Sequence, residues 1–150
     1  AKELVEAGAT EFTRARRYGR PLSVLALELD RYDEILAEHG EGIVEEVRKT
    51  ATRVLGRVLR ANDLFGLRSE RGFAVILPET GGEFAAEVGE RLRAASEDED
   101  VFTGDELILF TLSVGAAGMI AADESFAVTL ERARAAMVAA SKAGGNSVFP

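Results

Sequence analysis

Apolar residues recur along the chain at two spacings, one typical of amphipathic helices and the other of buried strands. Helical patterns predict helices over residues 2–18, 31–38, 43–59, 81–95 and 126–143. Nearly continuous apolar runs predict strands over residues 22–29, 73–77, 106–109 and 110–119, and shorter strands at 64–67 and 148–149. The chain therefore mixes helices and strands without forming a strict βαβ repeat.

The strongest local signal is a β-hairpin near the middle of the chain. Its polar tip, Ser69-Glu70-Arg71-Gly72, contains a glycine and follows an apolar segment at residues 64–67. The next five residues, 73–77, are all apolar, which predicts a strand buried on both faces. We therefore expect this hairpin to lie in the centre of the sheet.

These elements predict an α+β fold, with a central, mainly antiparallel sheet and helices on both faces. The 150 residues are enough for one domain with its own core. Thr80-Gly81-Gly82-Glu83 reads as a capping box at the start of a helix, and Asp123 or Ser125 is expected to cap the last one. Because the chain starts abruptly at the predicted helix over residues 2–18, we expect a further region upstream.

Composition narrows the classes of function. The net charge of −8 argues against general nucleic-acid binding, because phosphates would be repelled. The absence of cysteine excludes disulfides and thiolate metal sites, and we expect a cytoplasmic domain. No apolar run is long enough to span a bilayer, so no membrane contact is expected of this domain. His39, the single histidine, has no neighbouring ligand cluster in the sequence and is expected to be solvated.

Residues 60–78 resemble the signature hairpin of the GGDEF family, the diguanylate cyclases, which join two GTP molecules into cyclic di-GMP. The signature turn, Gly-Gly-Asp/Glu-Glu-Phe, corresponds here to Ser69, Glu70, Arg71, Gly72 and Phe73, so that only Phe73 matches. The Ser-Val-Gly strand at residues 113–115 and the order of elements extend the resemblance over almost the whole chain. It implies a single degenerate domain over residues 1–150 with a nucleotidyl-cyclase-like fold.

The resemblance also assigns the positions at which active members carry out catalysis. Magnesium would be held by the first carboxylate of an Asp-x-Asp, here Glu28, and by the third turn residue, here Arg71. A cation cannot ligate a cation, so we expect no metal and no cofactor, and we expect Arg71 to lie beside Glu28 and Asp30 instead. The alternative is that both carboxylates merely end a strand. The guanine-reading positions correspond to Leu36 and Glu45, and the triphosphate-neutralising positions to Ser141 and Gly145.

A second site of the family is intact in the sequence. Arg60-x-x-Asp63, five residues before the turn, matches the inhibitory site that binds cyclic di-GMP, and the second arginine of that site corresponds to Arg91. An arginine fork suits the O6 and N7 acceptors of guanine, and a carboxylate such as Asp63 accepts from the opposite edge. The bare motif is short, and a structural salt bridge between Arg60 and Asp63 is the alternative.

Two functions follow from this sequence. The first is a catalytically inactive GGDEF domain, and therefore not an enzyme, that acts as a cyclic di-GMP receptor through Arg60, Asp63 and Arg91. The alternative is a ligand-independent protein-interaction module derived from a diguanylate cyclase. In both cases we expect the partner to be an upstream domain or another signalling protein. An active cyclase would need the metal and phosphate ligands that this sequence lacks.

Overall fold

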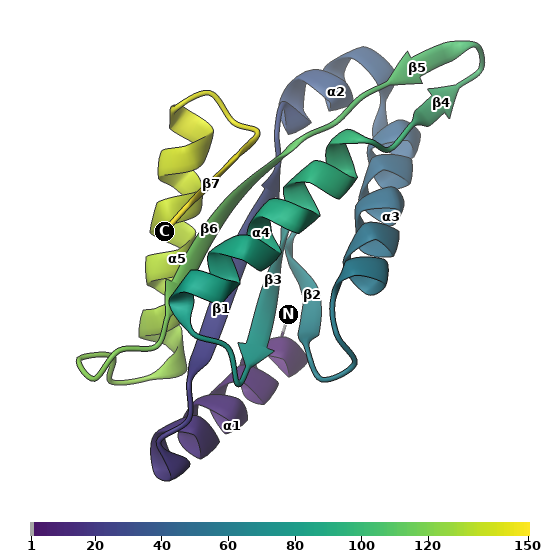
Figure 1. Cartoon of the computed structure of the whole chain (residues 1–150). Coiled ribbons are helices and arrows are strands. Elements are labelled where there is room, and N and C mark those ends of the chain that lie inside the picture. Colours follow the sequence, from purple (N-terminus) through teal and green to yellow (C-terminus); the bar gives the residue numbers. More distant parts are fainter. Residues whose placement is uncertain (1) are drawn as a thin grey trace.

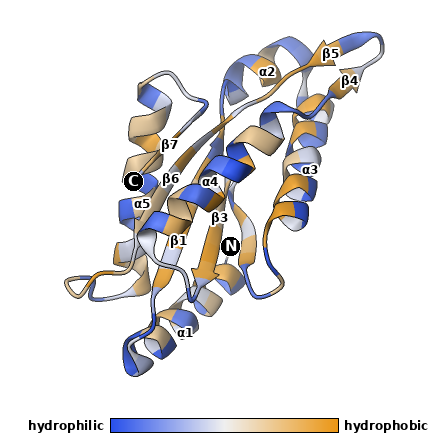
Figure 2. Ribbon diagram, in the orientation of Figure 1, coloured by the Kyte–Doolittle hydropathy of each residue, from blue (hydrophilic) through white to orange (hydrophobic). Residues whose placement is uncertain are grey.

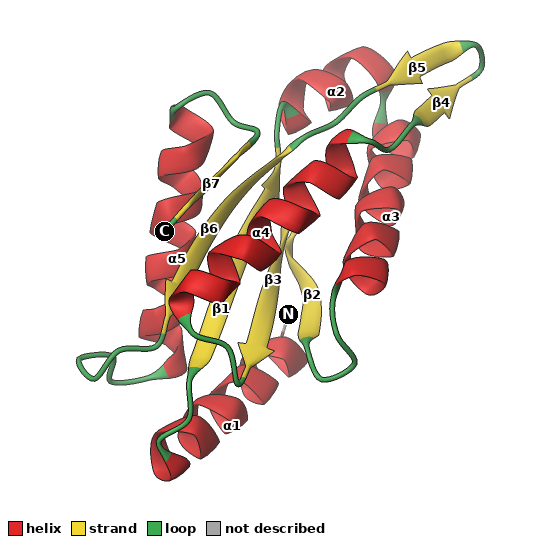
Figure 3. Ribbon diagram, viewed as in Figure 1, coloured by secondary structure: helices red, strands yellow, loops and turns green. Residues whose placement is uncertain are grey.

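The computed structural model describes residues 2–150, which fold around one five-stranded sheet (Figures 1 and 3). Its elements in chain order are α1 (Lys2–Tyr18), β1 (Leu22–Leu29), α2 (Tyr32–His39), α3 (Glu41–Val58), β2 (Leu64–Ser69), β3 (Gly72–Pro78), α4 (Gly82–Glu97), β4 (Val101–Thr103), β5 (Glu106–Ile108), β6 (Leu112–Gly118), α5 (Phe126–Lys142) and β7 (Ser147–Phe149). The predicted helices and strands are all present, with shifts of a few residues at their ends.

The strand order is β2-β3-β1-β6-β7, and every neighbouring pair is antiparallel except β6 and β7. The prediction of a mainly antiparallel sheet is confirmed. The prediction that the hairpin lies in the centre of the sheet is only half right, because β3 is an inner strand but β2 is the edge strand. β1 is the middle strand, and its register places Glu28 opposite Gly72 of β3 and Ser113 of β6. The fold thereby brings the end of β1 beside the hairpin turn.

The helices form a layer on each face of the sheet, as the fold class predicts. Successive residues of a strand point to opposite faces, so Leu25 and Leu27 of β1 join a core with α2, α3 and α4. Val24 and Ala26 point to the other face and pack with residues of α1 and α5. Figure 2 shows the apolar strands between these helices, whose outer positions are largely polar. Both faces of β1 are therefore covered, which explains its nearly unbroken apolar sequence.

β4 and β5 form a small second sheet, and the sequence predicted only one of these two strands. β5 was expected, but β4 was hidden by the acidic residues that precede it, and these two strands form an antiparallel hairpin. The acidic segment itself is partly helical, since α4 continues to Glu97. His39 is less solvated than expected, because it lies between Glu38 and Glu106, each 3.5 Å from one ring nitrogen.

The helix caps differ from the prediction for a physical reason. Gly81, not Thr80, precedes α4, and no side chain caps this helix. The Thr80 hydroxyl donates to the Pro78 carbonyl and accepts from Arg60, so it is already engaged elsewhere. At α5, Ser125 occupies the cap position without a side-chain hydrogen bond. Within residues 2–150, no helix has the length and apolar character that crossing a membrane requires.

Asp123 holds together the loop between β6 and α5. Its buried carboxylate accepts hydrogen bonds from Arg132, from the Thr129 hydroxyl and from the Ile120 backbone N–H. Arg16 of α1 donates to the Asp123 carbonyl at 2.6 Å, which ties the first helix to the same loop. The Arg132 guanidinium is the main reason that the pKa of Asp123 is lowered to about 2.

We predict that this carboxylate contributes stability that acid removes. Because its pKa is lowered on folding, the contribution is complete above its ordinary value of 3.8 and is lost as the pH falls toward about 2. Asp123→Asn should lower the free energy of unfolding at pH 7 by about 2–3 kcal/mol and flatten its pH dependence between about pH 4 and 2. Urea unfolding at several pH values measures both effects. Glu124→Gln, at the exposed neighbour, is the control, and equal stability of the two variants would contradict the prediction.

Candidate functional site

The end of β1 and the turn between β2 and β3 form one edge of the sheet. The Leu29 N–H donates to the Arg71 carbonyl at 2.8 Å, so the turn is tied directly to β1. A Cβ atom on Gly72 would lie 2.0 Å from the Leu27 carbonyl oxygen, so only glycine fits where β3 approaches β1. Glu28 therefore lies beside the turn, as the sequence predicts.

The arginine that approaches Glu28 is Arg68 and not Arg71. In β2, Leu67 pairs with Phe73 and Ser69 pairs with Gly72, so Arg68 is the extra residue of a β-bulge. Its guanidinium lies 3.7 Å from the Glu28 carboxylate and 3.6 Å from the Met137 sulfur of α5. The bulge thus directs the Arg68 guanidinium past β3 toward Glu28, and Gly72 of β3, which has no side chain, leaves room for it.

The predicted contact of Arg71 with Glu28 and Asp30 is therefore wrong. Arg71 extends from the turn toward α2, where it pairs with Asp33 at 2.7 Å and stacks over the Tyr32 ring at 4.7 Å. Its hydrogen bond lowers the pKa of the Asp33 carboxyl, although both side chains are largely exposed.

Asp30 is satisfied by neutral donors. The hydroxyls of Thr111 and Ser113 donate to its two oxygens at 2.6 and 2.5 Å, and the backbone N–H of Asn146 donates at 2.8 Å. Gly145 packs so closely that a Cβ atom there would lie 2.9 Å from the Asp30 carboxyl group, and its φ of 76° also favours glycine. The segment before β7 is thereby closed over this carboxylate.

The other predicted catalytic positions do not converge on a shared contact. Leu36 is half-buried and packs against the apolar core of α2 and α3. Glu45 is exposed on α3, where Lys49 lies 3.8 Å away, and Ser141 is exposed in the last turn of α5. Among residues 2–150, no three side chains of His, Asp or Glu gather as a metal site would require.

Arg60 and Asp63 form a compact clamp after α3. Both the Arg60 backbone N–H and its guanidinium donate to the Asp63 carboxylate, at 2.8 and 3.2 Å. The same guanidinium donates to the Thr80 hydroxyl at 2.7 Å and to the Pro78 carbonyl at 3.3 Å. The Asp63 side chain is only 1% exposed, whereas that of Arg60 is 58% exposed. The clamp joins the loop before β2 to the loop after β3 and leaves one side of Arg60 open.

Arg91 is not part of this clamp. It is exposed on α4 and forms no ion pair or side-chain hydrogen bond with any residue from 2 to 150. The structure therefore joins Arg60 with Asp63 and leaves Arg91 separate from both. That Arg60, Asp63 and Arg91 together form one cyclic di-GMP site therefore remains a prediction.

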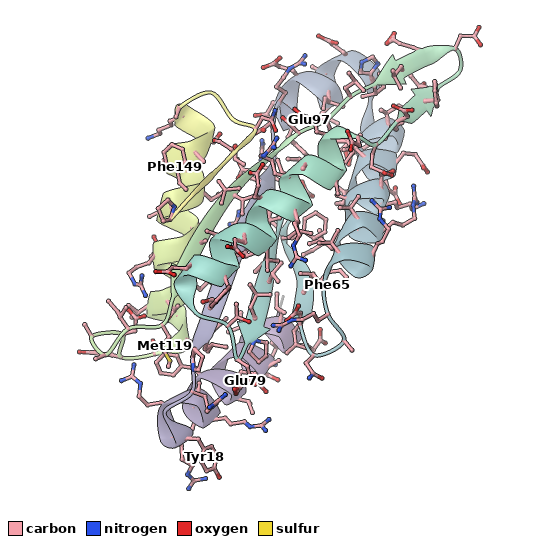
Figure 4. All side chains as sticks on the ribbon, viewed as in Figure 1. Tyr18, Phe65, Glu79, Glu97, Met119 and Phe149 are labelled. Atoms are coloured by element: carbon pink, nitrogen blue, oxygen red, sulfur yellow. The ribbon has the colours of Figure 1, made fainter. Side chains whose placement is uncertain are left out.

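A cleft of about 450 Å³ lies beside the clamp, and no motif in the sequence indicates it. Ala61 and Asn62, the middle residues of the Arg-x-x-Asp motif, line it together with Arg14 of α1 and Arg20 of the segment that follows α1. Figure 4 shows Glu79, which also lines the cleft and pairs with Arg20, at the same end of the molecule as Tyr18. The side chains around the cleft come from segments far apart in sequence, so no local pattern could predict it.

The model of the diguanylate cyclase GGDEF domain family matches residues 3–147. The chain belongs to the GGDEF family. Among curated relatives of this GGDEF domain, the response regulator PleD of Caulobacter vibrioides is 28% identical over 137 residues, which are 90% of the domain and 30% of that protein. The domain spans about 30% of the length of the curated relatives that it matches.

Solved GGDEF structures have the same fold. The GGDEF domain of DgcB from Caulobacter crescentus, in complex with c-di-GMP, superimposes with a TM-score of 0.93 at 22% identity, covering 99% of this domain and 85% of that chain. The diguanylate cyclase SiaD of Pseudomonas aeruginosa, in complex with its activator SiaC, gives a TM-score of 0.93 at 26% identity, covering 99% and 56%. The predicted fold class is confirmed by these matches.

The edge of this GGDEF domain does not fit a magnesium ion held by β1 and the turn. Arg68 already approaches the Glu28 carboxylate, and three donors already occupy Asp30. The turn offers Arg71 where a second carboxylate would be needed. A hard cation here would face a guanidinium on one side and would have to displace hydroxyl donors on the other.

We predict that Asp63 matters for the stability of the GGDEF domain even without a ligand. Asp63→Ala removes the acceptor of the Arg60 backbone N–H and of its guanidinium, and should lower the free energy of unfolding by about 1–3 kcal/mol. Arg91→Ala, at an exposed and unpaired position, should change it by less than about 0.5 kcal/mol. Urea denaturation compares the two, and an unaltered midpoint for Asp63→Ala would show that the clamp contributes nothing to folding.

Proposed function

We propose that this GGDEF domain makes no cyclic di-GMP and instead binds it as a receptor through Arg60 and Arg91. The observation that carries the proposal is that the Arg60 side chain is held by hydrogen bonds and is still exposed. Its guanidinium is held by Asp63, Thr80 and Pro78, yet most of the side chain is exposed. A fixed and accessible arginine suits the paired acceptors of guanine, because little side-chain entropy remains to be lost on binding.

The role of Asp63 changes in this proposal. Its carboxylate is almost fully buried and already accepts from Arg60, so it is poorly placed to accept from a guanine edge. We therefore assign Asp63 to positioning Arg60, while Arg60 and Arg91 contact the ligand. Arg14, which lines the neighbouring cleft, adds positive charge on that side for a ligand with two phosphates.

The absence of catalysis is supported by the other edge of the domain. Phosphoryl transfer depends on cations and donors that neutralise the developing charge at the phosphates. Here Glu28 faces Arg68, Gly145 and Ser141 carry no positive charge, and Leu36 packs in the core. In this proposal, the end of β1, the β2–β3 turn and the segment before β7 contact one another for stability and take no part in catalysis.

A second function, a ligand-independent interaction module, is favoured by one observation. The hydrogen bonds between Arg60 and Asp63 are explained by the folded loop alone, without any ligand. In that case the motif would persist for stability, and cyclic di-GMP would not bind. Direct binding measurements separate these two functions.

We predict no turnover of GTP. Purified domain incubated with GTP and either magnesium or manganese should yield no cyclic di-GMP above a reaction without protein, as measured by liquid chromatography with mass spectrometry. Restoring a carboxylate with Arg71→Glu should not restore activity either, because Arg68 still neutralises Glu28 and the phosphate-binding cations are still lacking. Product that accumulates in proportion to the concentration of unmodified domain would overturn this part of the proposal.

We also predict cyclic di-GMP binding, measured by titration calorimetry. Arg60→Ala should weaken it about ten- to a hundred-fold, because each charged hydrogen bond contributes about 1.5–3 kcal/mol. Arg91→Ala should weaken it as well while leaving the unfolding midpoint unchanged. Arg134→Ala, on α5 across the sheet, is the matched control and should bind like the unmodified domain. Full binding by Arg60→Ala, or none by the unmodified domain, would favour the interaction module.

A further inference from the structure

The hairpin of β4 and β5 projects from the domain at the upper right of Figure 1. One face of the hairpin belongs to the core, since Val101 and Ile108 are only 5% and 6% exposed. The other face carries Phe102, Leu107 and Leu109, which are 61%, 45% and 58% exposed. We call these three residues the hairpin strip.

The hairpin strip reverses the pattern expected of a half-buried hairpin. Outward positions of such strands are normally polar, because only the inward face leaves water. Here they are apolar, and Figure 2 shows β5 coloured as hydrophobic beside a hydrophilic tip. Phe102 and Leu107 are direct cross-strand partners, but their mutual contact still leaves about half of each side chain in water. A contiguous exposed apolar patch is typical of an interaction surface, whereas single exposed residues are not.

The surroundings of the hairpin strip are acidic. Residues 97–106 contain six carboxylates, and residues 94–131 contain no lysine or arginine. Three of these carboxylates, at Asp98, Asp100 and Asp105, form no ion pair or side-chain hydrogen bond within residues 2–150. Asp100 directly precedes β4 and is exposed. Glu97 and Glu99 pair with Arg93 and Arg57, so the strip combines apolar anchors with the three carboxylates that have no ion-pair partner within residues 2–150, Asp98, Asp100 and Asp105.

We propose that the hairpin strip docks a basic amphipathic segment of a partner protein. Apolar side chains of that segment would cover Phe102, Leu107 and Leu109, and its lysines or arginines would pair with Asp98, Asp100 and Asp105. Charge complementarity decides between occupants, because a second copy docked strip to strip would bring two sets of carboxylates together. An uncharged apolar partner would leave those carboxylates unpaired at the rim.

This surface is independent of the proposed cyclic di-GMP site. Arg60 is bound to the loop that contains Pro78 and Thr80, and Figure 4 shows Glu79 of that loop at the end opposite Glu97, which precedes the hairpin. Loss of docking therefore need not alter cyclic di-GMP binding, and failure of either proposal leaves the other standing. A partner protein bound at the hairpin would let the domain act in signalling whether or not the domain binds a nucleotide.

The test uses nitrogen-15-labelled domain and a synthetic amphipathic helix of leucine and lysine as the probe. We expect the probe to shift the backbone amide signals of residues 98–109 in two-dimensional NMR spectra in a saturable manner. The triple variant Phe102→Ser, Leu107→Ser and Leu109→Ser should weaken binding at least about ten-fold, because central apolar contacts dominate such interfaces. The charge variant Asp98→Asn, Asp100→Asn and Asp105→Asn keeps the strip and should weaken binding several-fold, most strongly at low salt.

The controls separate the strip from general attraction to an acidic protein. Phe84→Ser with Ile120→Ser removes exposed apolar side chains elsewhere and should leave binding unchanged. A probe with glutamate in place of lysine should not bind. The proposal is overturned if the triple variant, shown to be folded by its thermal melting, binds the lysine probe as tightly as the unmodified domain. It is also overturned if sedimentation shows that the unmodified domain self-associates through the strip, because the occupant is then a second copy.

Discussion

The structure depends on the register in which β1 pairs with both of its neighbours. One alignment places Glu28 opposite Gly72 of β3 and Ser113 of β6, and the same alignment buries both faces of β1. A shift by one residue would move the large Leu25 and Leu27 into the core that Val24 and Ala26 fill, so packing favours this register. The edge where the turn, Asp30 and the segment before β7 meet is a consequence of that constraint.

Charge at this edge is balanced by the protein itself. Arg68 reaches Glu28 from a bulge in the edge strand, and hydroxyl and backbone donors surround Asp30. At the other end of the sheet, the clamp of Arg60 and Asp63 connects two loops but leaves the guanidinium accessible. The two ends of the sheet therefore differ. At one end the carboxylates of Glu28 and Asp30 already have partners within the protein, and at the other end the Arg60 guanidinium is accessible.

The sequence predicted the elements with strong periodicity and missed features that depend on a single extra residue or a distant neighbour. The apolar run at residues 73–77 predicted an inner strand because only a strand buried on both faces tolerates it. The prediction that Arg71 lies beside Glu28 and Asp30 failed because a bulge at Arg68 changes which side chain faces β1, and the spacing of residues did not indicate this bulge. β4 was missed because three residues carry too little periodicity beside an acidic run, and the burial of Asp63 depends on contacts that spacing does not show.

We propose that the guanidinium of Arg68, 3.7 Å from Glu28, balances the charge of this carboxylate in place of a divalent cation. The most direct measurement is a titration of the nitrogen-15-labelled domain with manganese in the presence of GTP, since manganese broadens the NMR signals of nearby amides. We expect no selective broadening at residues 28–30 or 69–72, and the same result without GTP. Saturable broadening confined to these residues would show that the edge still binds a divalent cation and would contradict the account.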